Sequence, residues 1–200
     1  MISIRRAEDR GHFDHGWLKT FHTFSFADYY DPKFMGFGTL RVINEDTIAG
    51  GEGFPTHGHR DMEILTYVVE GAIAHRDSTG KEGVIRPGEL QRMSAGRGVR
   101  HSEYNALEEG ETHLLQIWIE PNETGIEPRY ETRDFSAPLE KGEPVLLASP
   151  NGKSGSLEIA QDAWVWARRF TTGTEWHLPL SKGRLGWLQV IKGQASWADN

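Results

Sequence analysis

The stretch FPTHGHRDMEILTYVVEG, residues 54–71, contains two histidines one residue apart, a glutamate four positions later and then an apolar, β-branched run. The run ends at Gly71, as is typical of a strand that stops at a turn. Histidines two positions apart on a strand point to the same side of it. The stretch therefore predicts either half of a metal site or a strand edge that happens to be rich in histidine.

A second group with the same spacing lies about forty residues further along the chain. In GRGVRHSEYN, residues 96–105, His101 and Glu103 are two positions apart and share a strand face. The residues between the two groups are enough for several antiparallel strands that fold the second group back beside the first. We expect His57, His59 and His101 to converge inside a barrel with one or two carboxylates.

Two glutamates compete for the role of carboxylate ligand. If the first strand continues without a bulge, Glu63 shares the face of the first two histidines, while Glu103 shares the face of the third. Strand parity alone permits both. Imidazole combined with carboxylate suits a divalent transition metal, whereas calcium and magnesium prefer oxygen ligands. The other histidines are interpreted as hydrogen-bonded surface or mouth residues, with His75 and His113 the least improbable additional ligands.

Composition and charge exclude several classes of function. The net charge of −7 disfavours direct binding of nucleic acid, because an acidic surface repels phosphates. The chain has no cysteine, which excludes disulfides, zinc–cysteine sites and thiol chemistry. No apolar stretch approaches the roughly 20 residues that span a bilayer, and the N-terminus MISIRRAEDRGHF has no signal-peptide core. We expect a soluble cytoplasmic protein without membrane contact.

Strand-like runs recur at intervals of about 8–12 residues, and no segment keeps a helical period over three turns. The clearest runs are GTLRVIN (38–44), EILTYVVEG (63–71) and HLLQIWIEP (113–121). DSTG (77–80) has the composition of a hairpin turn. This pattern predicts an all-β protein built as an antiparallel sandwich or barrel.

The second half of the chain contains a weak copy of the first. Aligning YVVEG (67–71) with QVIKG (189–193) matches a strand and its turn, but it places Pro179 and Ser181 opposite the two histidines of the first motif. The copy therefore lacks the candidate ligands. If it reflects a duplication, Asn200 corresponds to a position about halfway through the second barrel.

The predicted domain division follows from this copy. Residues 124–144 are rich in proline and charge and are interpreted as a connection, after which strands resume at LEIA, WVWARRFTT and GWLQVIKGQASW. We expect an N-terminal metal-binding barrel over residues 1–130. A partial C-terminal barrel without metal ligands is expected over residues 131–200.

These residues resemble the cupins and, more specifically, the pirin family and its bacterial pirin-like quercetinases. Gly51, five residues, His-x-His, three residues and Glu63 fit the first cupin motif, although the gap from Glu63 to Gly71 is one residue longer than usual. The resemblance to pirins covers essentially the whole chain, but such proteins usually continue about thirty residues further. It is carried by HGWLKTFHTFSFADYYDP (15–32), MGFGTLRVIN (35–44), THGHRDMEILTYVVEG (56–71), MSAGRGVRHSEYN (93–105) and QIWIEP (116–121).

The resemblance implies a bicupin, two antiparallel jelly-roll-like barrels, with metal only in the first. The implied ligands are His57, His59, His101 and Glu103, and Glu63 then has a structural role. The implied activity is that of a quercetin 2,3-dioxygenase, which cleaves flavonols with dioxygen and releases carbon monoxide, with Glu103 as the proton acceptor. Iron(II) is the expected metal, and manganese, nickel, cobalt, copper or zinc would also suit these ligands.

The expected partners are a small planar phenolic substrate and dioxygen, bound by a monomer. The aromatic residues of HTFSFADYYDP (22–32) either line a mouth for such a substrate or simply pack the barrel. Two other functions compete with the dioxygenase. One is a non-catalytic, metal- or redox-sensing regulator that binds a protein partner, and the other is an isomerase that needs no dioxygen.

Overall fold

β-Strands make up most of the regular structure in the computed structural model, which describes residues 2–196. The predicted all-β, antiparallel fold class is confirmed, and the one α-helix has five residues. The elements are η1 (Ala7–Asp9), β1 (Gly11–Asp14), β2 (Leu18–His22), β3 (Leu40–Ile48), β4 (Gly53–His59), β5 (Glu63–Glu70), β6 (Ile73–Asp77), β7 (Glu82–Ile85), β8 (Glu89–Ser94), β9 (Val99–Asn105), β10 (Thr112–Ile119), β11 (Arg129–Asp134), α1 (Ser136–Glu140), β12 (Val145–Ser149), η2 (Lys153–Gly155), β13 (Leu157–Glu158) and β14 (Val165–Ala167).

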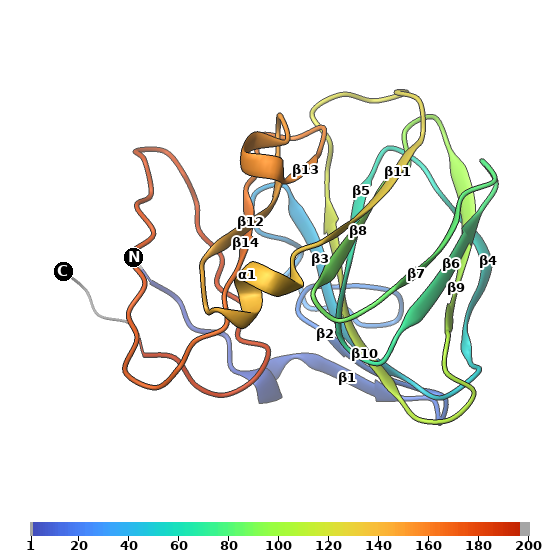
Figure 1. The fold of residues 1–200 in the computed structure, drawn as a ribbon, viewed down its shortest axis with the longest axis horizontal. Coiled ribbons are helices and arrows are strands. Elements are labelled where there is room, and N and C mark those ends of the chain that lie inside the picture. The colour runs from blue at the N-terminus through green and yellow to red at the C-terminus, as the bar shows by residue number, and fades with distance from the viewer. Residues whose placement is uncertain (1, 197–200) are drawn as a thin grey trace.

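Two antiparallel sheets face each other and enclose the interior of the first barrel (Figure 1). The larger sheet has seven strands in the order β1-β2-β3-β10-β5-β8-β11, and the smaller has four in the order β4-β9-β6-β7. The predicted strands at 38–44, 63–71 and 113–121 correspond to β3, β5 and β10 at the centre of the larger sheet. The predicted DSTG turn is confirmed, since the Gly80 amide donates to the Asp77 carbonyl at 3.1 Å.

Strand β5 is buried on both faces, which explains its nearly continuous apolar sequence. Ile64 and Val68 point into the barrel, where each joins an apolar cluster. Leu65 and Tyr67 point to the opposite face and belong to the largest cluster of the protein. A strand of an antiparallel sheet usually alternates apolar and polar residues, so the missing alternation requires a cover over the outer face.

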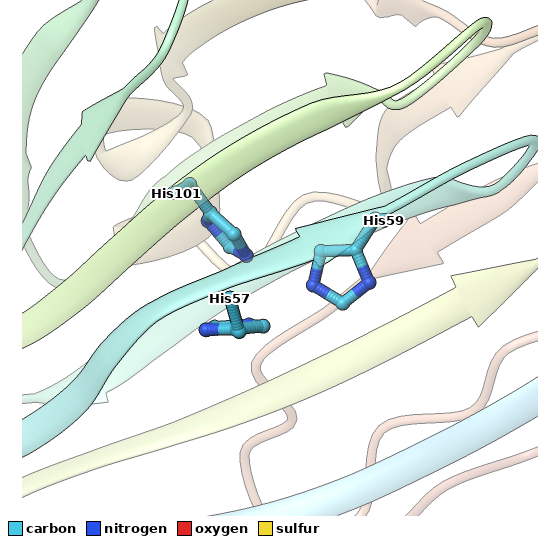
Figure 2. A group of neighbouring side chains, drawn as sticks. All are labelled: His57, His59 and His101. Carbon is cyan, nitrogen blue, oxygen red and sulfur yellow. The ribbon is translucent and has the colours of Figure 1, made fainter.

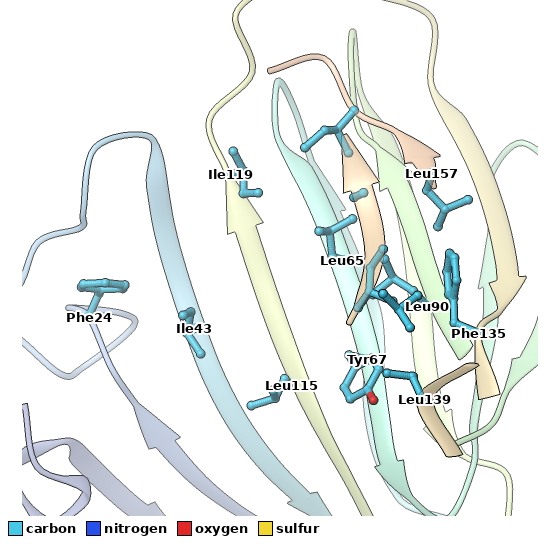
Figure 3. Packing of buried hydrophobic residues seen from close by; sticks show 14 residues of the cluster. Phe24, Ile43, Leu65, Tyr67, Leu90, Leu115, Ile119, Phe135, Leu139 and Leu157 are labelled. Carbon is cyan, nitrogen blue, oxygen red and sulfur yellow. The ribbon is translucent and has the colours of Figure 1, made fainter. Parts of the chain in front are cut away.

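The C-terminal part of the chain supplies that cover (Figure 3). Leu139 of α1, Leu147 of β12 and Leu157 of β13 pack against the face that carries Leu65 and Leu90. Strands β13, β12 and β14 form a separate three-stranded sheet, in which β12 and β13 are parallel. The second half is therefore attached to the first through a shared apolar core.

Two sequence interpretations of the second half are wrong. Residues 124–144 do not form a mere connection, because β11 pairs with β8 as the edge strand of the larger sheet and α1 follows it. Residues 186–196 of the predicted strand GWLQVIKGQASW form no strand, and Trp197 lies outside the described residues. Among the described residues, no strand pairs with the backbone of this segment, and an apolar alternating sequence alone does not make a strand.

The internal copy keeps only its turn. Gly71 and Gly193 both adopt a left-handed backbone, with φ of +80° and +82°, but the strand before Gly71 has no counterpart before Gly193. The alignment beyond residue 196 falls outside the described residues. The predicted boundary between residues 130 and 131 falls inside β11, and the division into two domains stays a prediction. Within residues 2–196, no helix is long and apolar enough to cross a membrane.

Packing between the halves predicts the effect of truncating Leu157. This side chain is fully buried in the shared core, so Leu157→Ala should lower the free energy of unfolding by about 2–5 kcal/mol. Leu185, at 68% exposure, is the matched control, and its change to alanine should cost no more than about 0.5 kcal/mol. Urea unfolding of the three proteins measures both values. Equal stabilities for the two variants would contradict the packing described.

Candidate metal centre

A bulge in β4 turns the first two histidines into the barrel. Phe54 pairs with Glu103 and His57 pairs with His101, so two residues of β4 lie opposite one residue of β9. The extra residue lies around Pro55, which donates no backbone hydrogen bond and is tolerated at bulges. In a regular strand Phe54 and His57, three positions apart, would point to opposite faces. Because of the bulge, both residues pair with residues of β9 whose side chains point into the barrel.

The three predicted histidines come together on the paired strands β4 and β9 (Figure 2). Their ring centroids are 4.4 Å apart for His57 and His101, 4.8 Å for His57 and His59, and 4.9 Å for His59 and His101. One nitrogen from each ring lies within 4.8 Å of the others. His101 is buried, whereas His57 and His59 are half-buried, so the cluster opens to one side.

In both His57 and His101 the Nδ1 atom makes the hydrogen bond, which leaves Nε2 available as a ligand. His57 Nδ1 lies 2.8 Å from the carbonyl oxygen of Pro55, to which it donates. His101 Nδ1 lies 3.4 Å from Nδ1 of His75. His101 Nε2 is buried with no hydrogen-bond partner in the described structure. A buried ring nitrogen without a partner is costly unless something else binds it, and neutral imidazole is the commonest metal ligand among side chains.

The electrostatics of the cluster keep these rings neutral. Burial, together with the neighbouring imidazoles of His57 and His75, lowers the pKa of His101 to about 3. Burial also lowers the pKa of His59 to about 4, with added repulsion from His101 and His57. Neutral imidazole carries the lone pair that binds a metal, so at pH 7 both rings are in the ligating form.

Glu103 is buried beside His101 and held by three donors. Thr66 Oγ1 and Gln91 Nε2 donate to its Oε1, each at 3.2 Å, and Gln116 Nε2 donates to its Oε2 at 2.8 Å. Its carboxylate lies within 4.8 Å of ring nitrogens of both His101 and His75. Each carboxylate oxygen can accept two bonds, so Oε2 keeps a free lone pair.

Glu63 does not share the face of the histidines, because the strand is not continuous between His59 and Glu63 as that alternative required. The chain leaves β4 after His59 and turns through Asp61, which has φ of +46°, before β5 begins in the other sheet. Glu63 accepts a hydrogen bond from Ser94 Oγ at 2.8 Å. Burial raises the pKa of Glu63, although Ser94 and nearby Arg92 lower it. Its role here is structural, on the side of the larger sheet that the C-terminal part covers.

Several residues of the site escaped the sequence analysis. Gln91, Gln116 and Thr66 line the interior and hold Glu103, yet isolated amides and hydroxyls on strands give no sequence signal. For His75, the sequence signal is its position two residues before Asp77 on the same strand face. The two side chains contact each other in the structure. The other extra candidate, His113, hydrogen-bonds to Glu45 at 2.9 Å and takes no part in either histidine group.

The aromatic stretch after β2 contributes one wall beside the site. Trp118 of β10 packs edge-on against His59, with ring centroids 4.8 Å apart, and Phe26 packs edge-on against Trp118 at 5.3 Å. His22 instead packs against Phe26 and Tyr29. These contacts show that aromatic residues of this stretch pack against one another and against Trp118, and a substrate mouth lined by residues 22–32 stays a prediction.

The donor set fits a transition metal better than a hard cation. Three imidazoles and one carboxylate oxygen satisfy its preference for nitrogen with some oxygen, and four protein ligands would leave coordination positions for other molecules. The orphaned Nε2 of His101 points to the same conclusion. The ligand set His57, His59, His101 and Glu103 stays a prediction, which these contacts support.

Comparison with known proteins agrees with the fold. Residues 3–119 match the family model Pirin, and residues 146–200 match the model of the quercetinase C-terminal cupin domain. A protein named quercetin 2,3-dioxygenase from Escherichia coli is 50% identical over 196 residues, which are 98% of this chain and 84% of that protein. A putative quercetin 2,3-dioxygenase from Pseudomonas aeruginosa is 50% identical over 194 residues, 96% of this chain and 83% of that protein.

Among solved structures, the bacterial pirin YhhW from Escherichia coli in complex with nickel(II) is similar to this chain. Its TM-score is 0.79 at 54% sequence identity, and the match covers 83% of this chain and 70% of that one.

Metal binding should depend on His101 and not on His113. His101→Gln removes the buried Nε2 at the centre of the cluster, so nickel(II) affinity should fall by more than about 100-fold. His113→Gln changes a histidine that lies outside both groups and should bind as the wild type does. Isothermal titration of the metal-free proteins measures the affinities. Similar affinities for both variants would remove His101 from the site.

Asp46 of β3 predicts a pH dependence of stability. Burial, with a smaller contribution from the charge of Glu103, raises its pKa to about 7 against the opposing effect of a hydrogen bond from Thr20. Because the folded state holds this proton more tightly than the unfolded chain, Asp46 stabilises the fold at low pH, and that stability is lost between about pH 4 and pH 7. Asp46→Asn removes the titration. Its stability relative to the wild type should therefore rise with pH over this range, by at most about 1.4 kcal/mol per pH unit.

Urea unfolding of the metal-free wild type and Asp46→Asn at pH 5 and pH 8 measures this difference. A difference that does not change with pH would show that Asp46 is ionised throughout.

Proposed function

The chain belongs to the pirin family, and from this premise we propose that it is a metal-dependent dioxygenase that cleaves flavonols such as quercetin with dioxygen and releases carbon monoxide. The observation that carries the proposal is the buried, unpartnered Nε2 of His101 at the centre of three imidazoles. Relatives named quercetin 2,3-dioxygenase or putative quercetin 2,3-dioxygenase support the choice of reaction. They are 50% identical to this chain over nearly its whole length.

The proposed centre consists of His57, His59, His101 and Glu103. A divalent transition metal bound by them would supply a Lewis acid for the phenolic oxygen of the substrate and bring dioxygen to the same place. Iron(II) is the proposed metal, and the nickel of the similar Escherichia coli pirin shows that a relative accepts another ion. Manganese, cobalt, copper and zinc suit the same donors.

Glu103 is the proposed proton acceptor. A flavonol must lose its hydroxyl proton before its ring becomes electron-rich enough to react with dioxygen, and a buried carboxylate can take that proton. Oε1 already accepts two hydrogen bonds, whereas Oε2 accepts only one from Gln116. The proton therefore goes to Oε2, and Gln116 keeps this oxygen oriented toward the site.

The surroundings of the histidines suit a flat aromatic ligand. The open side of the cluster carries the half-buried His57 and His59. Trp118 packs edge-on against His59, and Phe26 packs edge-on against Trp118. Aromatic walls favour planar aromatic ligands through offset and edge-to-face contacts. We propose that a planar phenolic substrate enters from this side, which brings its hydroxyl to the imidazoles.

Substitutions of Glu103 and Glu63 should have different effects on activity. Glu103→Gln removes the proton acceptor and one ligand, so carbon monoxide release from quercetin under air should fall by at least about 100-fold. Glu63→Gln changes a carboxylate on the other side of the larger sheet and should leave turnover within about threefold of the wild type. The assay uses iron(II)-loaded protein and detects carbon monoxide in the headspace.

Three other outcomes would contradict the proposal. Wild-type turnover of a substrate under argon would indicate an isomerase, because a dioxygenase has no co-substrate there. A metal-loaded wild type that releases no carbon monoxide yet binds a protein partner would indicate a regulator. Full activity of Glu103→Gln would remove Glu103 from the reaction.

A further inference from the structure

Behind His101, away from the open side of the cluster, lies a chain of two further buried side chains. Strand β6 pairs with β9 so that His75 lies opposite Glu103 and Asp77 lies opposite His101. His101 Nδ1 lies 3.4 Å from His75 Nδ1, and His75 Nε2 lies 3.3 Å from Asp77 Oδ2. The side chains of His75 and Asp77 are 0% and 1% exposed, so water does not compete for these contacts.

The Asp77 side chain cannot rotate, because Oδ1, the oxygen that does not contact His75, accepts three hydrogen bonds. Oδ1 accepts from the Thr79 amide at 2.8 Å, from Thr79 Oγ1 at 2.6 Å and from the Lys81 amide at 3.2 Å. All three partners are donors, so an acceptor must occupy this position. Oδ2 is left facing His75, and the hairpin turn that follows β6 holds it there.

Because the Asp77 carboxylate is fixed, the donor and the acceptor can be assigned for each contact from Asp77 to His101. The Asp77 carboxylate can only accept, so His75 Nε2 carries a hydrogen and donates it. In a neutral imidazole the other nitrogen then has a lone pair, so His75 Nδ1 accepts from His101 Nδ1. His101 therefore carries its hydrogen on Nδ1, which leaves the lone pair on Nε2. That is the buried atom without a partner.

We propose that His75 and Asp77 are positioning residues that hold His101 in its metal-binding tautomer. This inference rests on the metal centre of the proposed function. Tyr130 of β11 assists by stacking on His75, with ring centroids 4.6 Å apart and an interplanar angle of 21°. A ring stacked on one face and contacted at both nitrogens has one orientation, and it transmits that orientation to His101. Partners behind a ligating histidine orient the ring and raise its basicity.

An alternative role for His75 makes a different prediction. A ring nitrogen of His75 lies within 4.8 Å of ligand atoms of His101 and Glu103, so these three residues could hold a second ion. In that case an ion would replace the contact between the two Nδ1 atoms. The positioning role requires one ion per chain, and the ligand role requires two.

Asp77→Asn is the decisive variant. The amide oxygen must take the place of Oδ1, because the two backbone amides of Thr79 and Lys81 need an acceptor there. The amide nitrogen then faces His75 and donates to its Nε2. His75 must carry its hydrogen on Nδ1 and donate to His101, which moves the hydrogen of His101 to Nε2 and removes the lone pair.

The expected result is a loss of nickel(II) affinity of about 10- to 100-fold, measured by isothermal titration of metal-free full-length protein. Asp134→Asn is the matched control, because its Oδ1 accepts from the Ser136 amide at 2.7 Å in a similar turn, remote from the histidines. The control should bind as the wild type does. Equal affinities for Asp77→Asn and the wild type would overturn the proposal, as would two nickel ions per wild-type chain.

A second measurement does not depend on the variant folding. Nitrogen-15 NMR of the metal-free wild type should place the imidazole hydrogen of His101 on Nδ1 and that of His75 on Nε2. The opposite assignment for His101 would overturn the positioning role while leaving the metal centre intact. A wild type that binds no nickel, iron or manganese would instead overturn the proposed function and this inference together.

Discussion

The pairing of β4 with β9, interrupted by the bulge at Pro55, is the constraint on which the site depends. The bulge brings His57 opposite His101, and the same proline supplies the carbonyl that anchors Nδ1 of His57. A regular strand would have kept Phe54 on the inner face and turned His57 outward. The close approach of the two strands leaves no room for a side chain at Gly53, where a Cβ would lie 2.2 Å from the Glu103 carbonyl oxygen.

The interior of the first barrel is divided into an apolar end and a polar end. Leu18, Ile48 and Ile73 belong to an apolar cluster, while Glu103 and Gln116 belong to a hydrogen-bonded network that surrounds the histidines. Buried polar groups are tolerated when they are paired, and they then have few alternative arrangements. The network therefore holds the Glu103 carboxylate in one orientation.

The larger sheet separates this polar interior from the core shared with the C-terminal part. Side chains alternate along β5, so Thr66 reaches Glu103 while Leu65 and Tyr67 pack against the second half. Burial on the outer face makes the sheet a rigid wall behind the site. The C-terminal part thus contributes to the site indirectly, by supporting the strands that carry Thr66 and Gln91.

By itself, the sequence was enough to predict the all-β class, the central strands and the three histidines, because periods of two and turn residues are local signals. It also favoured Glu103 through the family resemblance. Only the tertiary structure decided that Glu63 faces the other side, since a break at Asp61 resets strand parity. It alone placed β11 in the first sheet and His75 behind His101, because strand pairing between distant segments leaves no mark in local sequence.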